Sequence, residues 1–338
     1  MLYSLIDKMN RTLLLFILLL GNSIALLAQR NLSAWIAEID DAVAVCKMSL
    51  PGTHDAATGE GLRTMPMLGV TQALTLGEQW DCGVRAFDLR PAVSGDKLHI
   101  YHSLAKTKIS FAAAIDTICL RLKQYPSEFA IVLLREEQES ESSGERERWP
   151  VMVGECIASL GDRAATFSPS LTVGDLRGKI LFITRSAYSG TDKGALVRGW
   201  SHSPDGTCDA QLQAVGSSLS APLCVQDFYA PTNSRKQQQK ADAVARFINY
   251  KPDATRNVWV VNCLSGYTAT LLGTPFATSA GYKKNASMVH PMVLKQLSAR
   301  AQKQPLGIIL MDYAGVDTLK RYNIQGKELV NIIIEQNF

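Results

Sequence analysis

The hydrophobic and polar positions of this 338-residue chain divide it into short apolar runs and longer segments with helical spacing. The apolar runs are rich in Val, Ile, Leu and Phe and have the length of buried strands. They cover residues 43–50, 84–89, 98–101, 129–134, 179–184, 222–226, 258–263 and 307–311. Helical spacing is found at residues 111–124, 148–160, 236–249 and 291–302.

Strands that alternate with helices are typical of a parallel sheet with crossover helices. Eight such strands favour an α/β fold with a single (β/α)₈ barrel of the TIM type over two domains. The link at residues 91–97 is too short for a crossover helix, and residues 186–221 are rich in Ser and Gly. We therefore expect the barrel to be irregular at these two places.

The amino terminus has the pattern of a secretory signal peptide. A basic start is followed by the apolar run 13–20, and no further charge occurs before Arg30. The uncharged stretch is shorter than the roughly 20 residues that span a bilayer, so a retained anchor is the less favoured alternative. We predict cleavage near Ala28, with residues 1–28 as signal peptide and residues 29–338 as an exported domain that is periplasmic, on the cell surface or secreted.

Composition excludes several classes of protein. The chain is 46% hydrophobic and 20% charged, which is too apolar for a disordered or collagenous protein. Its net charge of +4 is not gathered in a basic stripe, so a nucleic-acid partner is not expected. Seven cysteines are too few for a disulfide-stapled miniprotein. Cys208 and Cys224 flank a loop-like stretch and are the pair that we expect to form a disulfide.

Ionisable or hydroxylated side chains follow every predicted strand. In chain order they are His54 and Asp55, Asp88 and Arg90, His102, Arg135 and Glu136, Arg185, Asp227 and Tyr229, Ser265, and Asp312 and Tyr313. Any one of them alone is more often a solvated strand end or a structural ion pair. Because the carboxyl ends of barrel strands surround one mouth, the whole set predicts a single site there.

Two of the five histidines, His54 and His102, follow different strands and can face each other across that mouth. Two imidazoles beside a scissile phosphate can act as base and acid near neutral pH. Arg90 would supply fixed positive charge to the phosphate oxygens, and Asp55 and Asp312 would orient the donors.

The other three histidines, His99, His202 and His290, are interpreted as structural or exposed. His99 points to the opposite strand face from His102, and the other two lie in a Ser/Gly-rich loop and beside a proline. The chain has no His-Glu-x-x-His motif, no paired Cys-x-x-Cys and no Asp-rich calcium loop, so neither a metal nor another cofactor is expected.

Four segments together resemble the bacterial phosphatidylinositol-specific phospholipase C family. They are SLPGTHD at 49–55, VRAFDLR at 84–90, IYHS at 100–103 and GIILMDY at 307–313. Supporting matches are YPSE at 125–128 with Arg135, RGKI at 177–180 with Arg185, and VQDFY at 225–229. The resemblance extends over nearly the whole mature chain, in the family's order, and implies an irregular (β/α)₈ barrel.

The resemblance also implies a reaction. His54 would take the proton of the inositol 2-hydroxyl, and His102 would protonate the departing diacylglycerol oxygen. Arg90 would stabilise the phosphate, Asp312 would support His54, and Asp55 would support the acid side. The products would be diacylglycerol and inositol 1,2-cyclic phosphate. Eukaryotic relatives hold calcium where this arginine stands, so no metal is implied here.

The same resemblance assigns a substrate-binding set. Its members are Asp88, Arg135, Arg185, Asp227 and Tyr229, where charged groups would bind the inositol hydroxyls and the tyrosine would stack on the ring. The family often has lysine in place of Arg135, and a planar guanidinium changes the shape of the pocket.

Residues 266–285 predict a Gly/Thr-rich loop beyond the seventh strand. Its apolar side chains and the two lysines that follow suggest either transient contact with a membrane surface or a lid over the barrel mouth. The side chains concerned are Tyr267, Leu271, Leu272, Phe276, Tyr282, Lys283 and Lys284.

Two other functions remain open. One is a metal-dependent phosphodiesterase of the glycerophosphodiester or sphingomyelinase type, although Thr58, Gly59 and Glu60 do not give the expected carboxylate ligands near the first histidine. The other is a barrel that binds lipid or glycan without catalysis, which the complete set of candidate catalytic residues disfavours.

Overall fold

The computed structural model describes residues 30–65, 69–137, 143–229, 231, 233–267, 270–271, 274–275 and 278–338. The chain divides into two compact units, Met1–Asn31 and Leu32–Phe338, and the described helices and strands lie in the second. The predicted signal peptide, residues 1–28, lies outside the described residues and stays a prediction. None of the described helices combines the length and the apolar character that a membrane-crossing helix needs.

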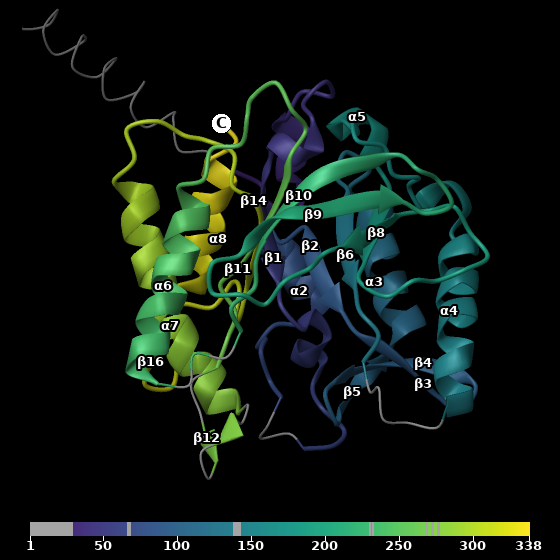
Figure 1. Ribbon diagram of the computed structural model, residues 1–338, viewed down its shortest axis with the longest axis horizontal. Coiled ribbons are helices and arrows are strands. Elements are labelled where there is room, and N and C mark those ends of the chain that lie inside the picture. Colours follow the sequence, from purple (N-terminus) through teal and green to yellow (C-terminus); the bar gives the residue numbers. More distant parts are fainter. Residues whose placement is uncertain are drawn as a thin grey trace, which may run out of the picture. The chain divides into compact units, whose positions relative to one another are not determined.

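Nine strands close into a barrel in the order β1-β14-β11-β10-β9-β8-β7-β6-β2 (Figure 1). Their bounds are β1 Ser49–Thr53, β2 Ala86–Leu89, β6 Ala130–Leu134, β7 Ile180–Thr184, β8 Ala195–Arg198, β9 Thr207–Ala214, β10 Ser220–Gln226, β11 Trp259–Cys263 and β14 Gly307–Met311. Neighbouring strands pair in parallel, except that β9 runs against both β8 and β10. The predicted irregular TIM-type barrel is confirmed.

The first barrel strand lies later in the chain than its apolar run suggests. Residues 43–50 were expected to form it, but Val45–Lys47 is a 3₁₀ turn, η2, and β1 runs through Pro51 and Gly52. Pro-Gly ordinarily marks a turn. Here a Cβ at position 52 would lie 2.8 Å from Leu310 and 3.0 Å from the Cβ of Ala86, so glycine lets β1 fit between its neighbours.

The third predicted strand, residues 98–101, is not part of the barrel. It belongs to an antiparallel sheet formed by β3 Pro91–Ser94, β4 Lys97–His102 and β5 Ala105–Ser110. The barrel is completed instead by β8 and β9, from the Ser/Gly-rich stretch that was expected to be irregular. The predicted disulfide between Cys208 and Cys224 is present and joins β9 to β10.

Helices connect most of the barrel strands, and α6, α7 and α8 pack side by side against one side of the barrel (Figure 1). The α-helices are α2 Leu76–Asp81, α3 Phe111–Gln124, α4 Ser143–Ala158, α5 Val173–Leu176, α6 Ser234–Ile248, α7 Ser279–Ser298 and α8 Gly326–Glu335. The other short elements are η1 Leu32–Glu38, η3 Ala56–Glu60, η4 Gly161–Arg163, and the ladders β12 Thr270–Leu271 with β13 Thr274–Pro275 and β15 Thr318–Leu319 with β16 Tyr322–Asn323.

Helix α7 starts twelve residues earlier than predicted. The sequence places Pro291 at the helix start, a position that proline favours, but the structure has it inside the helix. The helix begins after Thr278, whose Oγ1 accepts a hydrogen bond of 2.9 Å from the backbone N–H of Gly281. As a consequence Tyr282, Lys283 and Lys284 belong to a helix and not to a loop.

A buried ion pair lies at the amino-terminal end of the barrel. The guanidinium of Arg85 donates from Nε and Nη2 to Oε2 of Glu128 at 2.9 and 2.7 Å, and both side chains are 0% exposed. The guanidinium also lies 4.1 Å from the centroid of the Trp80 ring. Glu128 accepts hydrogen bonds from the backbone N–H groups of Ile36 and Ala37, so the pair ties η1 to the barrel.

Candidate active site

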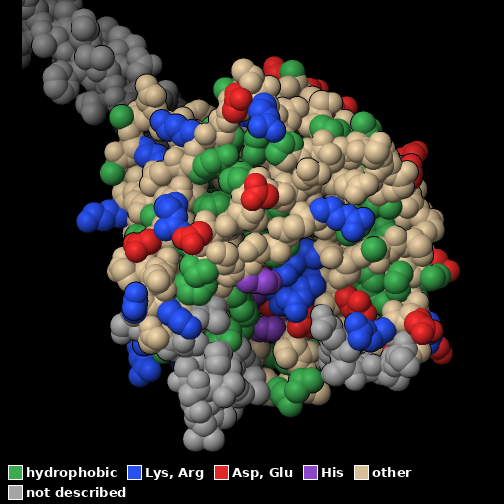
Figure 2. All heavy atoms as spheres, viewed as in Figure 1, with side chains coloured by type: hydrophobic (Ala, Val, Ile, Leu, Met, Phe, Trp, Pro, Cys, Tyr) green, Lys and Arg blue, Asp and Glu red, His purple; other side chains and the backbone are tan. Residues whose placement is uncertain are grey.

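The carboxyl ends of the barrel strands surround an open cavity. Its lining residues are His54, Asp88, Arg90, Leu133, Leu134, Arg135, Arg185, Trp200, His202, Asp227, Tyr229, Cys263, Ser265 and Leu310. Basic and histidine side chains gather near the centre of the face in Figure 2, with acidic side chains close by. The structure therefore brings most of the predicted site residues together, with Asp55, His102 and Asp312 behind this wall. Glu136 and Tyr313, which also follow predicted strands, are not among the lining residues.

His54, directly after β1, is held by a carboxylate on one ring nitrogen. Its Nδ1 lies 2.8 Å from Oδ1 of Asp312, so Nδ1 carries a proton and donates it. Its Nε2 is buried and makes no hydrogen bond to a described residue, although Oδ2 of Asp55 lies 3.0 Å away. In the neutral form of the ring, Nε2 is therefore the atom that can accept a proton from a substrate.

The charge around His54 makes it a strong base. Burial lowers the pKa of His54, but the neighbouring carboxylates of Asp55 and Asp312 outweigh burial and raise that pKa to about 10. Raising the pKa favours the cation, so near neutral pH the protonated Nε2 faces the Asp55 carboxylate, and the neutral form of the ring is the strong base that can take a proton from a hydroxyl.

Asp55 stands between the two histidines. Its Oδ2 lies 3.0 Å from Nε2 of His54 and 3.3 Å from Nε2 of His102. Its backbone is left-handed, with φ of 44°, and its N–H donates to Oδ2 of Asp88 at 3.2 Å. Burial raises the pKa of Asp55, but Arg90 and both histidines outweigh burial and lower it, so the side chain is an anion.

His102 comes from β4, the strand outside the barrel, and reaches over the mouth. Its Nδ1 lies 2.6 Å from the carbonyl oxygen of Gly69. A carbonyl can only accept, so Nδ1 donates and Nε2 is the atom that gains or loses a proton. That Nε2 faces Asp55 and lies 3.1 Å from Oη of Tyr282.

Arg90, directly after β2, supplies the fixed positive charge. Its Nε lies 3.1 Å from Oδ1 of Asp55 and its Nη2 lies 2.9 Å from Oδ2 of Asp88. Burial lowers the pKa of Arg90, but Asp55, Asp88 and Glu137 outweigh burial and raise it well above the ordinary value. The guanidinium is therefore always charged.

His54, Asp55 and Asp88 each offer a possible metal ligand, and these atoms lie within 4.8 Å of one another. The guanidinium of Arg90, however, already lies against both carboxylates. A divalent cation would have to share them with this fixed charge, so the donor set does not fit a resident metal ion.

No family model matches the chain. The 1-phosphatidylinositol phosphodiesterase of Listeria monocytogenes is 26% identical over 291 residues, which are 85% of this chain and 82% of the relative. In sequence and fold, the chain resembles the bacterial phosphatidylinositol-specific phospholipases C.

Solved structures of such phospholipases share the fold. The Staphylococcus aureus enzyme, described for its membrane binding, superposes with a TM-score of 0.71 at 22% identity, over 91% of this chain and 98% of the other. The Listeria monocytogenes enzyme gives 0.64 at 24% identity, over 91% and 99%. The 26% identity to the Listeria relative bears out the resemblance of the sequence motifs, and the solved structures bear out the fold alone.

One wall of the cavity includes a residue that sequence reasoning placed elsewhere. His202, interpreted as structural, lies in the cavity wall with Nδ1 2.9 Å from Oδ2 of Asp227 and Nε2 3.0 Å from Nη2 of Arg185. Trp200 donates from Nε1 to Oδ2 of Asp227 at 2.8 Å, and the Arg185 guanidinium lies 4.5 Å from its ring centroid. Burial raises the pKa of Asp227, but His202, Arg185 and Lys240 outweigh burial and lower it to about 2.

Tyr282 is the second residue that the sequence analysis misplaced. It was assigned to an exposed lid or membrane loop, but its side chain is fully buried and its Oη lies 2.7 Å from Oη of Tyr229. Leu272 and Phe276 of the same predicted loop lie outside the described residues. Whether residues 266–285 act as a lid or touch a membrane therefore stays a prediction.

The other two histidines have the surroundings that were expected. His99 is partly exposed on β4. His290 is buried in α7 with Nδ1 3.1 Å from the carbonyl oxygen of Ile324, and burial lowers the pKa of His290 to about 4.

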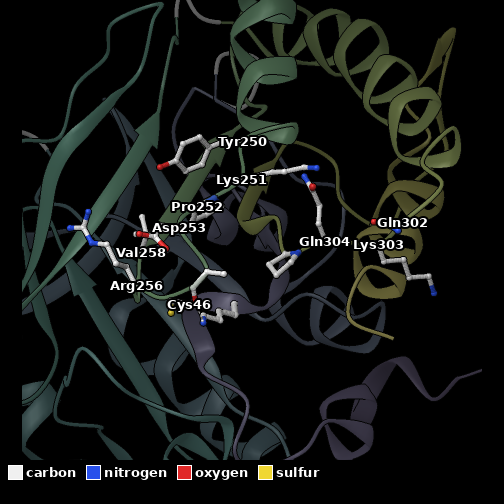
Figure 3. A pocket seen from close by; sticks show the side chains of 13 residues that line it. Cys46, Tyr250, Lys251, Pro252, Asp253, Arg256, Val258, Gln302, Lys303 and Gln304 are labelled. Carbon is white, nitrogen blue, oxygen red and sulfur yellow. Dashed lines mark hydrogen bonds between the residues drawn. The ribbon is translucent and has the colours of Figure 1, made fainter.

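A second open cavity, of about 300 Å³, lies at the other end of the barrel, beside the residues that precede β1, β11 and β14 (Figure 3). Four basic side chains and one acidic side chain line it, namely Lys47, Lys251, Arg256, Lys303 and Asp253. Figure 3 shows that Lys251 points toward Gln304, whereas Arg256 and Lys303 point away from each other. Its charges do not converge as those at the barrel mouth do.

Proposed function

We propose that this protein is a metal-independent phosphatidylinositol-specific phospholipase C that forms diacylglycerol and inositol 1,2-cyclic phosphate. One observation carries the proposal: Nε2 of His54 and Nε2 of His102 lie 3.0 and 3.3 Å from the same carboxylate oxygen of Asp55. The Arg90 guanidinium lies against the other oxygen of that carboxylate. A base, an acid and a fixed cation thus converge around one carboxylate at the barrel mouth.

In the proposed reaction His54 Nε2 takes the proton of the inositol 2-hydroxyl, and the resulting alkoxide attacks phosphorus. The bond between phosphorus and the glycerol oxygen breaks, and that oxygen receives the proton held by His102. Arg90 stabilises the charge that develops on the phosphate oxygens. Water then opens the cyclic phosphate more slowly, with the two histidines exchanging roles.

The supporting carboxylates have distinct tasks in this scheme. Asp312 keeps the proton of His54 on Nδ1, which leaves Nε2 free to act as base. Asp55 stabilises the cationic form of His102 before it gives up its proton. Asp88 contacts both the backbone N–H of Asp55 and the guanidinium of Arg90, and so fixes their relative positions.

The inositol ring would occupy the cavity lined by Arg135, Arg185, Asp227 and Tyr229. Charged groups there can hydrogen-bond ring hydroxyls, and the tyrosine can stack on the ring face. His202, which contacts both Arg185 and Asp227, belongs to the same wall.

Export and transient contact with a membrane surface are further parts of the proposal. The Cys208–Cys224 disulfide supports export, because disulfides persist mainly in oxidising compartments. Amino-terminal sequencing of protein recovered from outside the cytoplasm tests cleavage near Ala28. Sedimentation with phosphatidylinositol vesicles tests membrane contact.

The decisive experiment follows the products of phosphatidylinositol by phosphorus NMR in excess chelator. We expect a cyclic phosphate as first product, and loss of turnover in the folded variants His54→Ala and His102→Ala. Inhibition by chelator would favour a metal-dependent phosphodiesterase of the glycerophosphodiester or sphingomyelinase type. Binding of the lipid without any product would favour a non-catalytic barrel.

A further inference from the structure

The small sheet of β3, β4 and β5, which carries His102, has two exposed apolar side chains at one end. Leu104, in the turn between β4 and β5, is 58% exposed, and Met65 is 45% exposed. The two residues lie close together, because Oγ1 of Thr64 donates to the carbonyl oxygen of Leu104 at 3.2 Å and accepts from the backbone N–H of Lys106 at 2.9 Å. We refer to Met65 and Leu104 as the tip of the sheet.

Residues 61–64 extend the sheet along its β5 edge. Leu62 forms an antiparallel bridge with Thr107, and the backbone N–H of Arg63 donates to the carbonyl oxygen of Lys106 at 2.7 Å. Side chains alternate along a strand, so the buried side chains of Leu62 and Thr107 share the inner face. Arg63 and Lys106 therefore share the outer face. The segment that leads to the tip is thus fixed by backbone hydrogen bonds.

The outer face of this sheet is basic. Burial lowers the pKa of His99, and the positive charges of Lys106, Arg63 and Lys97 lower it further, so these cations lie near one another. The acidic side chain beside them, Asp96, is paired with Arg148. We call the cations the basic face, and within the part of the chain that the structure describes they form no ion pair: they are Arg63, Lys97, Lys106 and Lys108.

The tip borders the proposed general acid. His102 stands two residues before Leu104, and its Nδ1 lies 2.6 Å from the carbonyl oxygen of Gly69, four residues after Met65. In the proposed reaction His102 protonates the oxygen of the departing diacylglycerol, whose acyl chains remain in the bilayer. The bilayer surface must therefore lie close to His102, on the side where the tip is exposed.

We propose, on the basis of the proposed function, that the tip and the basic face dock the protein on a bilayer that contains anionic phospholipid. The side chains of Met65 and Leu104 enter the boundary between headgroups and acyl chains, which removes their apolar surface from water. Arg63 and Lys106, next to the tip, contact lipid phosphates around it, and their charge favours an anionic surface over a zwitterionic one. Docking through this sheet brings His102 to the lipid whose glycerol oxygen it protonates.

Sedimentation with vesicles that contain no substrate measures docking directly. The wild-type protein should bind vesicles of phosphatidylcholine with phosphatidylserine more tightly than vesicles of phosphatidylcholine alone. Leu104→Ser should weaken binding to both kinds about tenfold or more, because it removes a buried apolar side chain. Arg63→Glu combined with Lys108→Glu should weaken binding to the anionic vesicles about tenfold or more, and added salt should remove the preference of the wild type.

Leu120→Ser and Lys123→Glu are the matched controls. Both residues are exposed on α3, outside the small sheet, and both variants should bind vesicles within about twofold of wild type. Hydrolysis of soluble inositol 1,2-cyclic phosphate needs no bilayer, so Leu104→Ser should keep its rate on that substrate and lose activity on phosphatidylinositol vesicles. Equal loss on both substrates would show that Leu104 supports His102, and wild-type vesicle binding would show that the tip stays in water; either result overturns the proposal.

The docking surface and the proposed function fail in different ways. Vesicle binding that depends on Leu104, without cleavage of phosphatidylinositol, would support the docking surface and overturn the proposed function. Formation of the cyclic phosphate, with Leu104→Ser bound to vesicles as tightly as wild type, would do the reverse. Dimerisation that Leu104→Ser abolishes, without vesicle binding by the wild type, would assign the tip to a second copy of this chain and overturn the docking surface.

Discussion

Replacing Asp312 by asparagine tests the assignment of the base directly. The carboxylate lies 2.8 Å from Nδ1 of His54 and, with Asp55, raises the pKa of His54 to about 10. Asparagine keeps the size of the side chain and removes its charge. Two effects should follow, one on the pH dependence and one on the maximal rate.

The first effect is a shift in pH dependence. A hydrogen bond to a charged group contributes about 1.5–3 kcal/mol, and a neutral one about 0.5–1.5 kcal/mol. Asp312→Asn should therefore remove about 1–2 kcal/mol of preference for the imidazolium, which corresponds to roughly one pH unit. Because the pKa of His54 falls, the limb of the kcat/KM profile that His54 sets should move about one unit lower.

The second effect is a loss of rate. An asparagine N–H pointing at Nδ1 favours the tautomer with the proton on Nε2, and that tautomer cannot accept the substrate proton. The corresponding change in a serine protease triad lowers kcat about 10⁴-fold, so we expect a loss of about 10²- to 10⁴-fold here. Asp253→Asn, at the exposed far end of the barrel, is the control.

The assay is kcat/KM on phosphatidylinositol across the pH range in which the variant stays folded. An unchanged limb together with a wild-type maximal rate would refute the role of Asp312, and with it the identity of the base. A lower rate with an unchanged limb would mean that Asp312 positions the ring without setting its charge.

Three further predictions concern other parts of the molecule. Glu128→Gln leaves the buried Arg85 charge unpaired and should lower the free energy of unfolding by about 3–5 kcal/mol in urea titration; a change below about 1 kcal/mol would contradict the structural role of the pair. His202→Ala removes a contact of both Asp227 and Arg185, so KM for phosphatidylinositol should rise several-fold more than kcat falls; an unchanged KM would place the inositol ring elsewhere. The wild-type rate should be bell-shaped in pH because one imidazole must be neutral and the other cationic, and a flat rate from about pH 5 to 9 would argue against acid–base catalysis by the pair.

The residues that end the barrel strands could be predicted from the sequence because two simple patterns coincide there. β6 and β14 are buried along their whole length, so they appear as unbroken apolar runs, and polar side chains follow them directly. Prediction failed for β9 for the opposite reason. It is exposed at Cys208, Asp209 and Gln211, so its polar positions look like those of a loop.

His202 and Tyr282 were missed because the elements that position them were not predicted at those residues. His202 follows β8, which was not predicted, so nothing directed it to the barrel mouth. Tyr282 depends on where α7 starts. Thr278 caps that helix by accepting a hydrogen bond from the N–H of Gly281. A capping box needs Glu or Gln at position 281, and because glycine stands there the sequence lacks this signal of a helix start.

The origin of His102 has a consequence for how such an enzyme can diversify. The base and the fixed cation stand on the barrel itself, whereas the acid arrives on β4, in a small sheet inserted between β2 and β6. The barrel thus selects the ring and activates its hydroxyl, whereas the small sheet, an appendage of the barrel, protonates the departing group. Exchanging that appendage between homologues should alter which esters are tolerated while leaving recognition of the sugar-like ring intact.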